Sequence, residues 1–167
     1  MTDLNIFLQV RKAILYSLVT TTDFDATEST YHTQISPTLS KTQDPPILLP
    51  RPVLSQADAE ICMTLMTRFI EHFTPILFTP AVAAHMACTD VFADTWMKLV
   101  IQPALDNDGV YKPLETLEQI KSIDWVKEGL CSSCVVEKRE EWSEEQGTVW
   151  RLMDGWLELT PLRETAS

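Results

Sequence analysis

The stretch that decides the fold lies near the C-terminus, where LCSSC (residues 130–134) runs directly into VVEKREEWSEEQGTVWRLMDGWLEL (residues 135–159). Apolar residues recur there every seven positions, a spacing that returns side chains to nearly the same face of a helix. They are Val135, Trp142, Val149 and Trp156. The pattern predicts the longest helix of the chain, from about 132 to 158, with Gly147 as a weak point in its middle.

Apolar residues at helical spacing predict further helices upstream. These cover about residues 3–20, 55–73, 90–102 and 113–123, with a short segment at 125–126 that Gly129 ends. Ser55 begins a stretch similar to a capping box, and Thr89 is the expected cap of the third helix. Pro75 and Pro80 are expected to break the chain, and Pro103 to end the third helix.

The apolar faces of these helices predict the core. The residues expected to be largely buried are Leu65, Phe69, Trp96, Leu99 and Trp142. The stripe on the first helix is interrupted by Arg11 and Lys12 and needs a partner, either in this chain or in another protein.

Residues 21–53 differ in composition from the rest, being rich in Thr, Ser, Asp and Pro. Five prolines fall between 37 and 52, and a helix cannot run through them. We expect an irregular arm or linker there, with Ile47-Leu48-Leu49 as its anchor.

The sequence therefore predicts an all-α protein, an irregular bundle of five or six helices around one core with a long Pro/Thr/Ser-rich loop. Its parts are an N-terminal amphipathic helix (1–20), the arm (21–53), a helical domain (54–160) and a tail (161–167).

Composition excludes several classes of function. The formal net charge is −11, from 24 acidic and 13 basic residues, so the surface repels nucleic-acid phosphates and anionic membranes. No run of 18 apolar residues predicts a transmembrane helix, and the N-terminus is a poor signal peptide. Four cysteines without such a signal indicate free thiols or metal ligands, and an intracellular location in the cytoplasm or nucleus.

No sequence motif predicts catalysis. The chain lacks the Gly-x-Ser-x-Gly, P-loop, dinucleotide-binding and His-Glu-x-x-His patterns. The zinc-deaminase signature fails as well, because Ala87 stands where the catalytic glutamate is needed and Leu130 where a proline is needed. We therefore expect a protein that is not an enzyme.

The cysteine pair allows three interpretations. Cys131-x-x-Cys134 is half of a zinc site, and His85-x-x-Cys88 is a second half-site, because i, i+3 spacing lets each pair converge on one ion. A redox dithiol is disfavoured because no βαβ context is predicted. The expectation without metal is that Cys134 is a buried apolar residue and Cys131 a modestly exposed thiol at the helix start.

Tryptophans cover more than one face of the last helix. Trp150 and Trp156 lie about 120° apart on a helical wheel, so they cannot both face one narrow groove. Tryptophan is enriched at protein interfaces, which makes these two residues the candidate contacts for a protein partner.

The segment with Gly129-Leu130-Cys131-x-x-Cys134, Trp142, Val149-Trp150-x-Leu152 and Trp156-Leu157-x-Leu159 resembles the C-terminal region of uncharacterised fungal (basidiomycete) BTB/POZ-type proteins. The resemblance covers about residues 90–160, and the strand-rich BTB domain has no counterpart in this chain. It implies a helical protein-interaction module without a known active site. We accordingly expect a non-enzymatic interaction or scaffold module, with a structural zinc-binding helical domain as the alternative.

Overall fold

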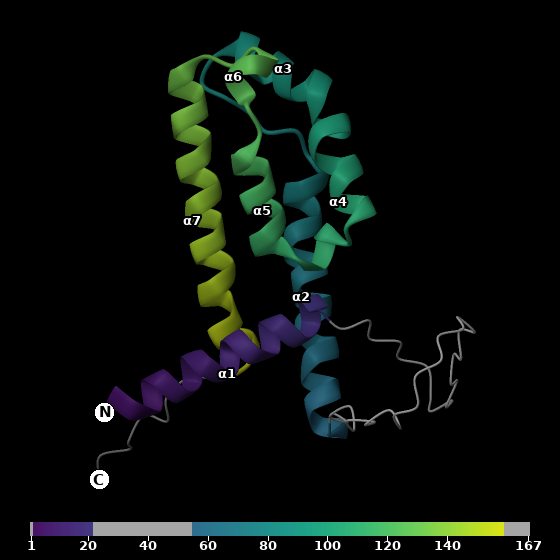
Figure 1. Ribbon diagram of the computed structural model, residues 1–167, viewed down its shortest axis with the longest axis vertical. Coiled ribbons are helices and arrows are strands. Elements are labelled where there is room, and N and C mark those ends of the chain that lie inside the picture. The colour runs from purple at the N-terminus through teal and green to yellow at the C-terminus, as the bar shows by residue number, and fades with distance from the viewer. Residues whose placement is uncertain (1, 22–54, 159–167) are drawn as a thin grey trace, which may run out of the picture.

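A computed structural model describes residues 2–21 and 55–158 (Figure 1), so the predicted tail at 161–167 and nearly all of the predicted arm lie outside the described residues. The long helices are α1 (Thr2–Thr21), α2 (Gln56–Phe78) and α7 (Ser132–Trp156). The shorter ones are α3 (Met86–Trp96), α4 (Gln102–Asp106), α5 (Pro113–Ser122) and α6 (Trp125–Glu128). A π-helical turn, Met97–Ile101, joins α3 to α4, and a 3-10 turn, Gly109–Tyr111, precedes α5.

The described residues contain helices and no strand, which confirms the predicted all-α bundle. Because α3, the π-helical turn and α4 follow one another without a gap, they form one continuous rod. The predicted number of five or six helices then matches the six rods among the described residues. None of these helices is both long enough and apolar enough to cross a membrane.

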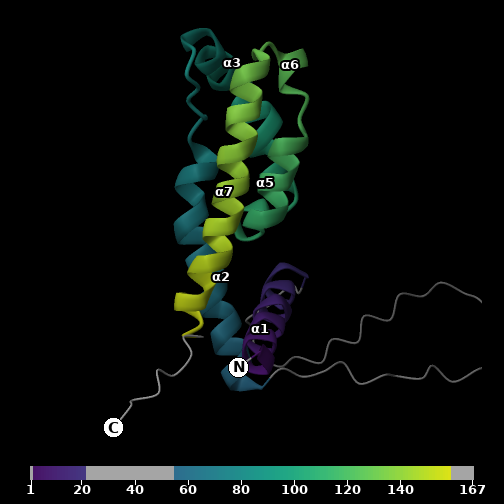
Figure 2. The ribbon, with the colours of Figure 1, turned by 90° about the vertical axis from the view of Figure 1, so that its left-hand side faces the viewer.

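The helices are arranged along the long axis of the molecule. Helices α2, α5 and α7 run along this axis (Figure 1). In this view α5 lies between α7 and the rod of α3 and α4. The start of α3, the short α6 and the start of α7 meet at one end. Helix α1 crosses the opposite end, against α2 (Figure 2).

Helix α2 begins as predicted but continues further. Ser55 caps its N-terminus, because the side-chain oxygen accepts a hydrogen bond from the Asp58 backbone N–H at 3.1 Å. The predicted break at Pro75 is wrong, because the helix runs through this proline to Phe78. Burial of Phe73 and Leu77 on either side of the proline offsets the one backbone hydrogen bond that proline cannot make.

The predicted end of the third helix at Pro103 is also wrong. The π-helical turn shifts the hydrogen-bond register, so that the Gln102 N–H donates to the Met97 carbonyl. Pro103 then lies in the first turn of α4, where a missing N–H is tolerated. The rod therefore passes through the proline and continues to Asp106.

The buried residues form two clusters instead of the single core that was predicted. The large core lies between α2 and the helices that follow it, and it contains Phe73, Leu77, Cys88, Phe92, Trp96, Val100, Ile101, Ala104, Leu117, Ile120, Trp125, Leu130, Cys134, Val135 and Trp142. The small core lies under α1, and it contains Leu15, Tyr16, Val19, Cys62, Leu65, Phe69, Val149 and Met153. Of the residues predicted to be buried, only Leu99 is half-buried.

Three tryptophans pack together at the centre of the large core. The ring centroids of Trp96, Trp125 and Trp142 lie 6.0–6.4 Å apart. Two of the buried indole N–H groups donate to backbone carbonyls, Trp96 to Leu77 at 2.8 Å and Trp125 to Ile120 at 2.9 Å. These bonds fix the orientation of the rings and satisfy their polar atoms.

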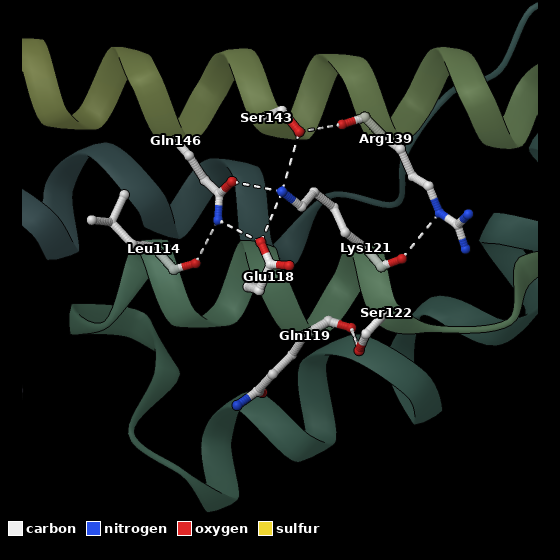
Figure 3. A network of polar contacts seen from close by, with 8 residues as sticks. All are labelled: Leu114, Glu118, Gln119, Lys121, Ser122, Arg139, Ser143 and Gln146. Atoms are coloured by element: carbon white, nitrogen blue, oxygen red, sulfur yellow. Dashed lines mark hydrogen bonds and ion pairs between the residues drawn. The ribbon is translucent and has the colours of Figure 1, made fainter.

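A polar network joins α5 to α7 along their outer edges (Figure 3). The Lys121 ammonium lies 2.8 Å from Glu118 and donates to Gln146 Oε1 at 2.8 Å and Ser143 Oγ at 3.1 Å. The Arg139 guanidinium donates to the Lys121 carbonyl at 3.1 Å. These contacts hold α7 in register with α5.

Helix α1 is fixed by two polar residues on its inner face. Lys12 is buried, donates to Asp154 at 2.7 Å and to the Trp150 carbonyl at 2.8 Å, and lies over the Trp150 ring. The Tyr16 hydroxyl donates to the Glu115 carboxylate and accepts from the Leu114 N–H. Lys12 therefore belongs to the packed face of α1, although the sequence pattern placed it as an interruption of that face.

Candidate metal centre

Two helix N-termini meet at one end of the bundle, and each carries one half-site. His85 is the N-cap residue of α3 and Cys88 is its third helical residue. In the same way, Cys131 is the N-cap residue of α7 and Cys134 is its third helical residue. The two half-sites thus occupy equivalent positions on two different helices.

Thr89 shapes the chain that leads into His85. Its hydroxyl accepts from the Ala83 N–H at 3.0 Å and lies 3.2 Å from the Ala83 carbonyl. Thr89 was predicted to cap a helix at 90–102, but α3 begins at Met86 and Thr89 fastens the preceding loop instead. The loop is held back against α3, which fixes His85 at the helix start.

The four side chains converge on one point. His85 Nδ1 lies 3.2 Å from Cys131 Sγ and 3.4 Å from Cys134 Sγ. Cys88 Sγ lies 3.6 Å from Cys131 Sγ. All four ligand atoms lie within 4.8 Å of one another. Within the described residues, this is the one group of three or more His, Cys, Asp or Glu side chains so placed.

These separations fit a tetrahedral ion. Zinc bonds of about 2.3 Å to sulfur and about 2.0–2.1 Å to nitrogen require sulfur atoms about 3.8 Å apart and nitrogen–sulfur distances of about 3.6 Å. The distances at Cys131 are 3.6 Å to Cys88 and 3.2 Å to His85. Each of these distances is slightly shorter than its tetrahedral value, and all the other pairs lie within 4.8 Å.

Hydrogen bonds and helix dipoles favour the thiolate form of Cys131. The Cys131 backbone N–H donates to Cys88 Sγ at 3.4 Å. The Ser133 hydroxyl, the backbone N–H of Cys134 and His85 lower the pKa of the Cys131 thiol to about 5, with Ser133 as the largest cause. The positive ends of two helices point toward the same group, and thiolate is the form of cysteine that binds metal.

The pKa of the Cys134 thiol is shifted in the opposite direction. A backbone hydrogen bond at His85 acts to lower this pKa, but burial and the neighbouring sulfurs of Cys131 and Cys88 together raise it. Several sulfurs at such short separations cannot all ionise without a nearby positive charge. A bound dication would supply that charge.

The site is open on one side and closed on the other. Cys88 and Cys134 are buried in the large core, Cys131 is half-buried, and His85 is exposed. The two buried sulfurs would connect a bound ion directly to the packing of α3 and α7. The exposed His85 and the half-buried Cys131 lie on the side of the cluster that solvent reaches.

The structure thus brings together all four residues of the two half-sites recognised in the sequence. Cys134 is buried and Cys131 is half-buried, which both interpretations predict. The convergence of these two residues with His85 and Cys88 is the arrangement that a metal site requires. The sequence pattern gave no role to Ser133 and predicted Thr89 only as a helix cap. Both are small hydroxyl residues within two positions of a cysteine, and this proximity was the only signal for a role at the site.

The two tryptophans proposed as partner contacts pack inside the chain. Trp150 is half-buried against Tyr16 and Lys12, and Trp156 is half-buried against Phe69 and His72. Their role in binding a partner stays a prediction.

Comparison with family models, curated proteins and solved structures finds no match to this chain. The resemblance to the C-terminal region of fungal BTB/POZ-type proteins also stays a prediction.

Proposed function

We propose that this chain is a structural zinc-binding helical domain, in which His85, Cys88, Cys131 and Cys134 hold one Zn²⁺ between the N-termini of α3 and α7. The observation that carries the proposal is the convergence of two half-sites, 43 residues apart in the chain, within 4.8 Å. Each half-site occupies the same two positions of its helix.

The ligand set selects the metal and its role. Three thiolates and one imidazole suit zinc, whereas calcium and magnesium require oxygen ligands. Four protein ligands fill a tetrahedral shell and leave no position for a reacting water, which is typical of structural sites. The ion would fasten α3 to α7 at the end of the bundle farthest from α1.

Metal analysis of the purified, tag-free protein tests the proposal. We expect about one zinc ion per chain, and we expect chelation to lower the unfolding temperature because binding and folding are linked. Co²⁺ in place of zinc should give the visible absorption of a tetrahedral ion with thiolate ligands.

Single substitutions identify the ligands. Cys88→Ser, Cys134→Ser and His85→Ala should each lower the zinc content. Cys62→Ala is the matched control, because Cys62 is a buried cysteine of the small core and lies outside the cluster. A reduced protein that contains no zinc and is unaffected by added zinc would exclude the proposed function.

A protein–protein interaction role is the second candidate, and the outer face of α1 favours it. Ile6, Phe7, Val10 and Ile14 are each more than half exposed, although they lie on a single side of the helix. The i, i+3 and i+7 spacing of Phe7, Val10 and Ile14 suits packing against another helix.

The partner to test first is a second copy of the chain, because two identical stripes can pair across a two-fold axis. Sedimentation should detect a concentration-dependent dimer that Phe7→Glu abolishes, while the equally exposed substitution Met97→Glu on the rod leaves it intact. A wild-type chain that stays monomeric at all concentrations would remove self-association as the role of this face.

A further inference from the structure

The centre combines one accessible sulfur with two protected ones. Cys131 is half-buried at the open side, next to the exposed His85, whereas Cys88 and Cys134 are buried. A small oxidant that enters from solvent therefore meets Cys131 Sγ before the other sulfurs. Cys88 Sγ is already in contact with it, at 3.6 Å.

We infer that the centre is a redox-controlled clamp, in which a hydroperoxide oxidises Cys131 and Cys88 to a disulfide and the zinc ion is released. The inference rests on the proposed function, since it describes the regulation of the same site. It differs from simple loss of metal, because the disulfide would replace the ion as the connection between α3 and α7.

The chemistry balances in two steps. The Cys131 thiolate attacks one peroxide oxygen, the O–O bond breaks, and the products are a sulfenic acid on Cys131 and hydroxide. The Cys88 thiolate then attacks the Cys131 sulfur, the S–O bond breaks, and a second hydroxide leaves as the disulfide forms. The two thiolates lose two electrons and the peroxide gains them. The zinc ion keeps its oxidation state throughout.

Loss of these two ligands explains the release of zinc. Only His85 and Cys134 would remain, and two ligands do not hold zinc in a structural site. A dithiol reductant restores both thiolates, so the clamp can return to its metal-bound form.

The identity of the disulfide decides what oxidation does to the fold. A bond between Cys88 and Cys131 joins the first turn of α3 to the start of α7 and keeps the two helices together. A disulfide between Cys131 and Cys134 would join two residues at the N-terminus of α7 and would leave no covalent link between α3 and α7. The inference therefore commits to the bond that crosses between the helices.

The experiment uses the full chain, loaded with zinc under reducing conditions, freed of reductant and treated with hydrogen peroxide. Zinc release is followed with a chromophoric chelator, and the disulfide is mapped by mass spectrometry after blocking free thiols. Trypsin separates the two half-sites, because Cys88 lies in the peptide 69–98 and both Cys131 and Cys134 lie in the peptide 128–138.

We expect each released zinc ion to be accompanied by the loss of two thiols and by a cross-link between these two peptides. A dithiol reductant with added zinc should reverse both changes. Cys62→Ala serves as the control and should behave like the parent, since Cys62 lies in the small core.

Three results would overturn the inference. They are zinc that stays bound under peroxide, a disulfide confined to the peptide 128–138, and zinc release with sulfinic acid on Cys131 and no disulfide. A reduced protein that never binds zinc would contradict the proposed function itself, and this inference with it. The zinc content before peroxide is added thus distinguishes the two failures.

Discussion

Lys12 is a charged residue whose side chain is almost completely buried. Its side chain is 1% exposed, and its ammonium is satisfied by Asp154, the Trp150 carbonyl and the face of the Trp150 ring. The Asp154 side chain is 45% exposed, so water screens the ion pair on one side. The aliphatic part of Lys12 packs within the small core while its charge is paired at the edge.

Replacing Lys12 with alanine should lower the free energy of unfolding by about 2–3 kcal/mol, less than for a fully buried pair because Asp154 reaches water. Arg11→Ala is the matched control, since the neighbouring Arg11 is exposed, and should change stability by less than about 0.5 kcal/mol. Urea unfolding followed by far-ultraviolet circular dichroism measures both. Equal effects of the two variants would show that α1 does not dock through Lys12.

Trp96 provides a second test at this scale. Trp96→Ala removes a buried indole and leaves the Leu77 carbonyl without its donor, so we expect a loss of about 3–5 kcal/mol. Met97→Ala, at the adjacent exposed position, should be nearly neutral. A Trp96 variant with the parent's urea midpoint would be inconsistent with the described large core.

At the scale of single helices, glycines at two positions have opposite roles. A Cβ atom at Gly109 would lie 2.6 Å from Thr116 Oγ1 and 3.0 Å from Ala104 Cβ, where α4, the 3-10 turn and α5 approach one another closely. A Cβ at Gly147 would meet only the flexible Arg151 guanidinium, at 3.6 Å. Gly109 is therefore required by packing, and Gly147 is not.

We expect Gly109→Ala to destabilise the protein by about 1–3 kcal/mol through overpacking. Gly147→Ala should stabilise it by about 0.5–1 kcal/mol, because alanine favours the helical state in the middle of α7. Thermal unfolding of the two variants compares them directly. A neutral Gly109→Ala variant would indicate that the turn relaxes away from α5.

The local sequence pattern predicted the positions of the helices well, but it did not predict which helices pack against one another. The seven-residue repeat located α7, and the Ser55 cap located the start of α2, because both signals are contained in a few neighbouring residues. The continuation of α2 past Pro75 depends on the burial of Phe73 and Leu77 by other helices, which no local pattern contains.

Local pattern was limited in the same way at the candidate metal centre. The i, i+3 spacing predicted the two half-sites, His85 with Cys88 and Cys131 with Cys134, because residues at this spacing share a helix face. Their convergence across 43 residues depends on how α3 and α7 meet. Lys12 and Arg11 are likewise indistinguishable in sequence until α1 is placed against α7.

At the scale of the whole molecule, the two cores lie at opposite ends of α7. The large core adjoins the candidate metal centre through Cys88 and Cys134, and the small core is completed by α1 (Figure 1). Helix α7 has 25 residues, or about 38 Å at 1.5 Å per residue, so a disturbance at one end need not reach the other.

Hydrogen exchange should separate the two ends. Chelation of zinc should speed exchange at residues 83–90 and 130–136 and leave α1 unchanged, whereas Lys12→Glu should speed exchange in α1 and leave the metal end unchanged. Peptide-resolved mass spectrometry measures both. Uniform acceleration by either treatment would mean that the two cores unfold as one unit.

The three packed indole rings of the large core have an optical consequence. At centroid separations of 6.0–6.4 Å, Trp96, Trp125 and Trp142 share their electronic excitation and should give an exciton couplet in the near ultraviolet. The remaining tryptophans, Trp150 and Trp156, border the small core and emit from a different environment. The native protein thus contains one group of tryptophans for each end. Near-ultraviolet circular dichroism and tryptophan fluorescence can together show which end unfolds first.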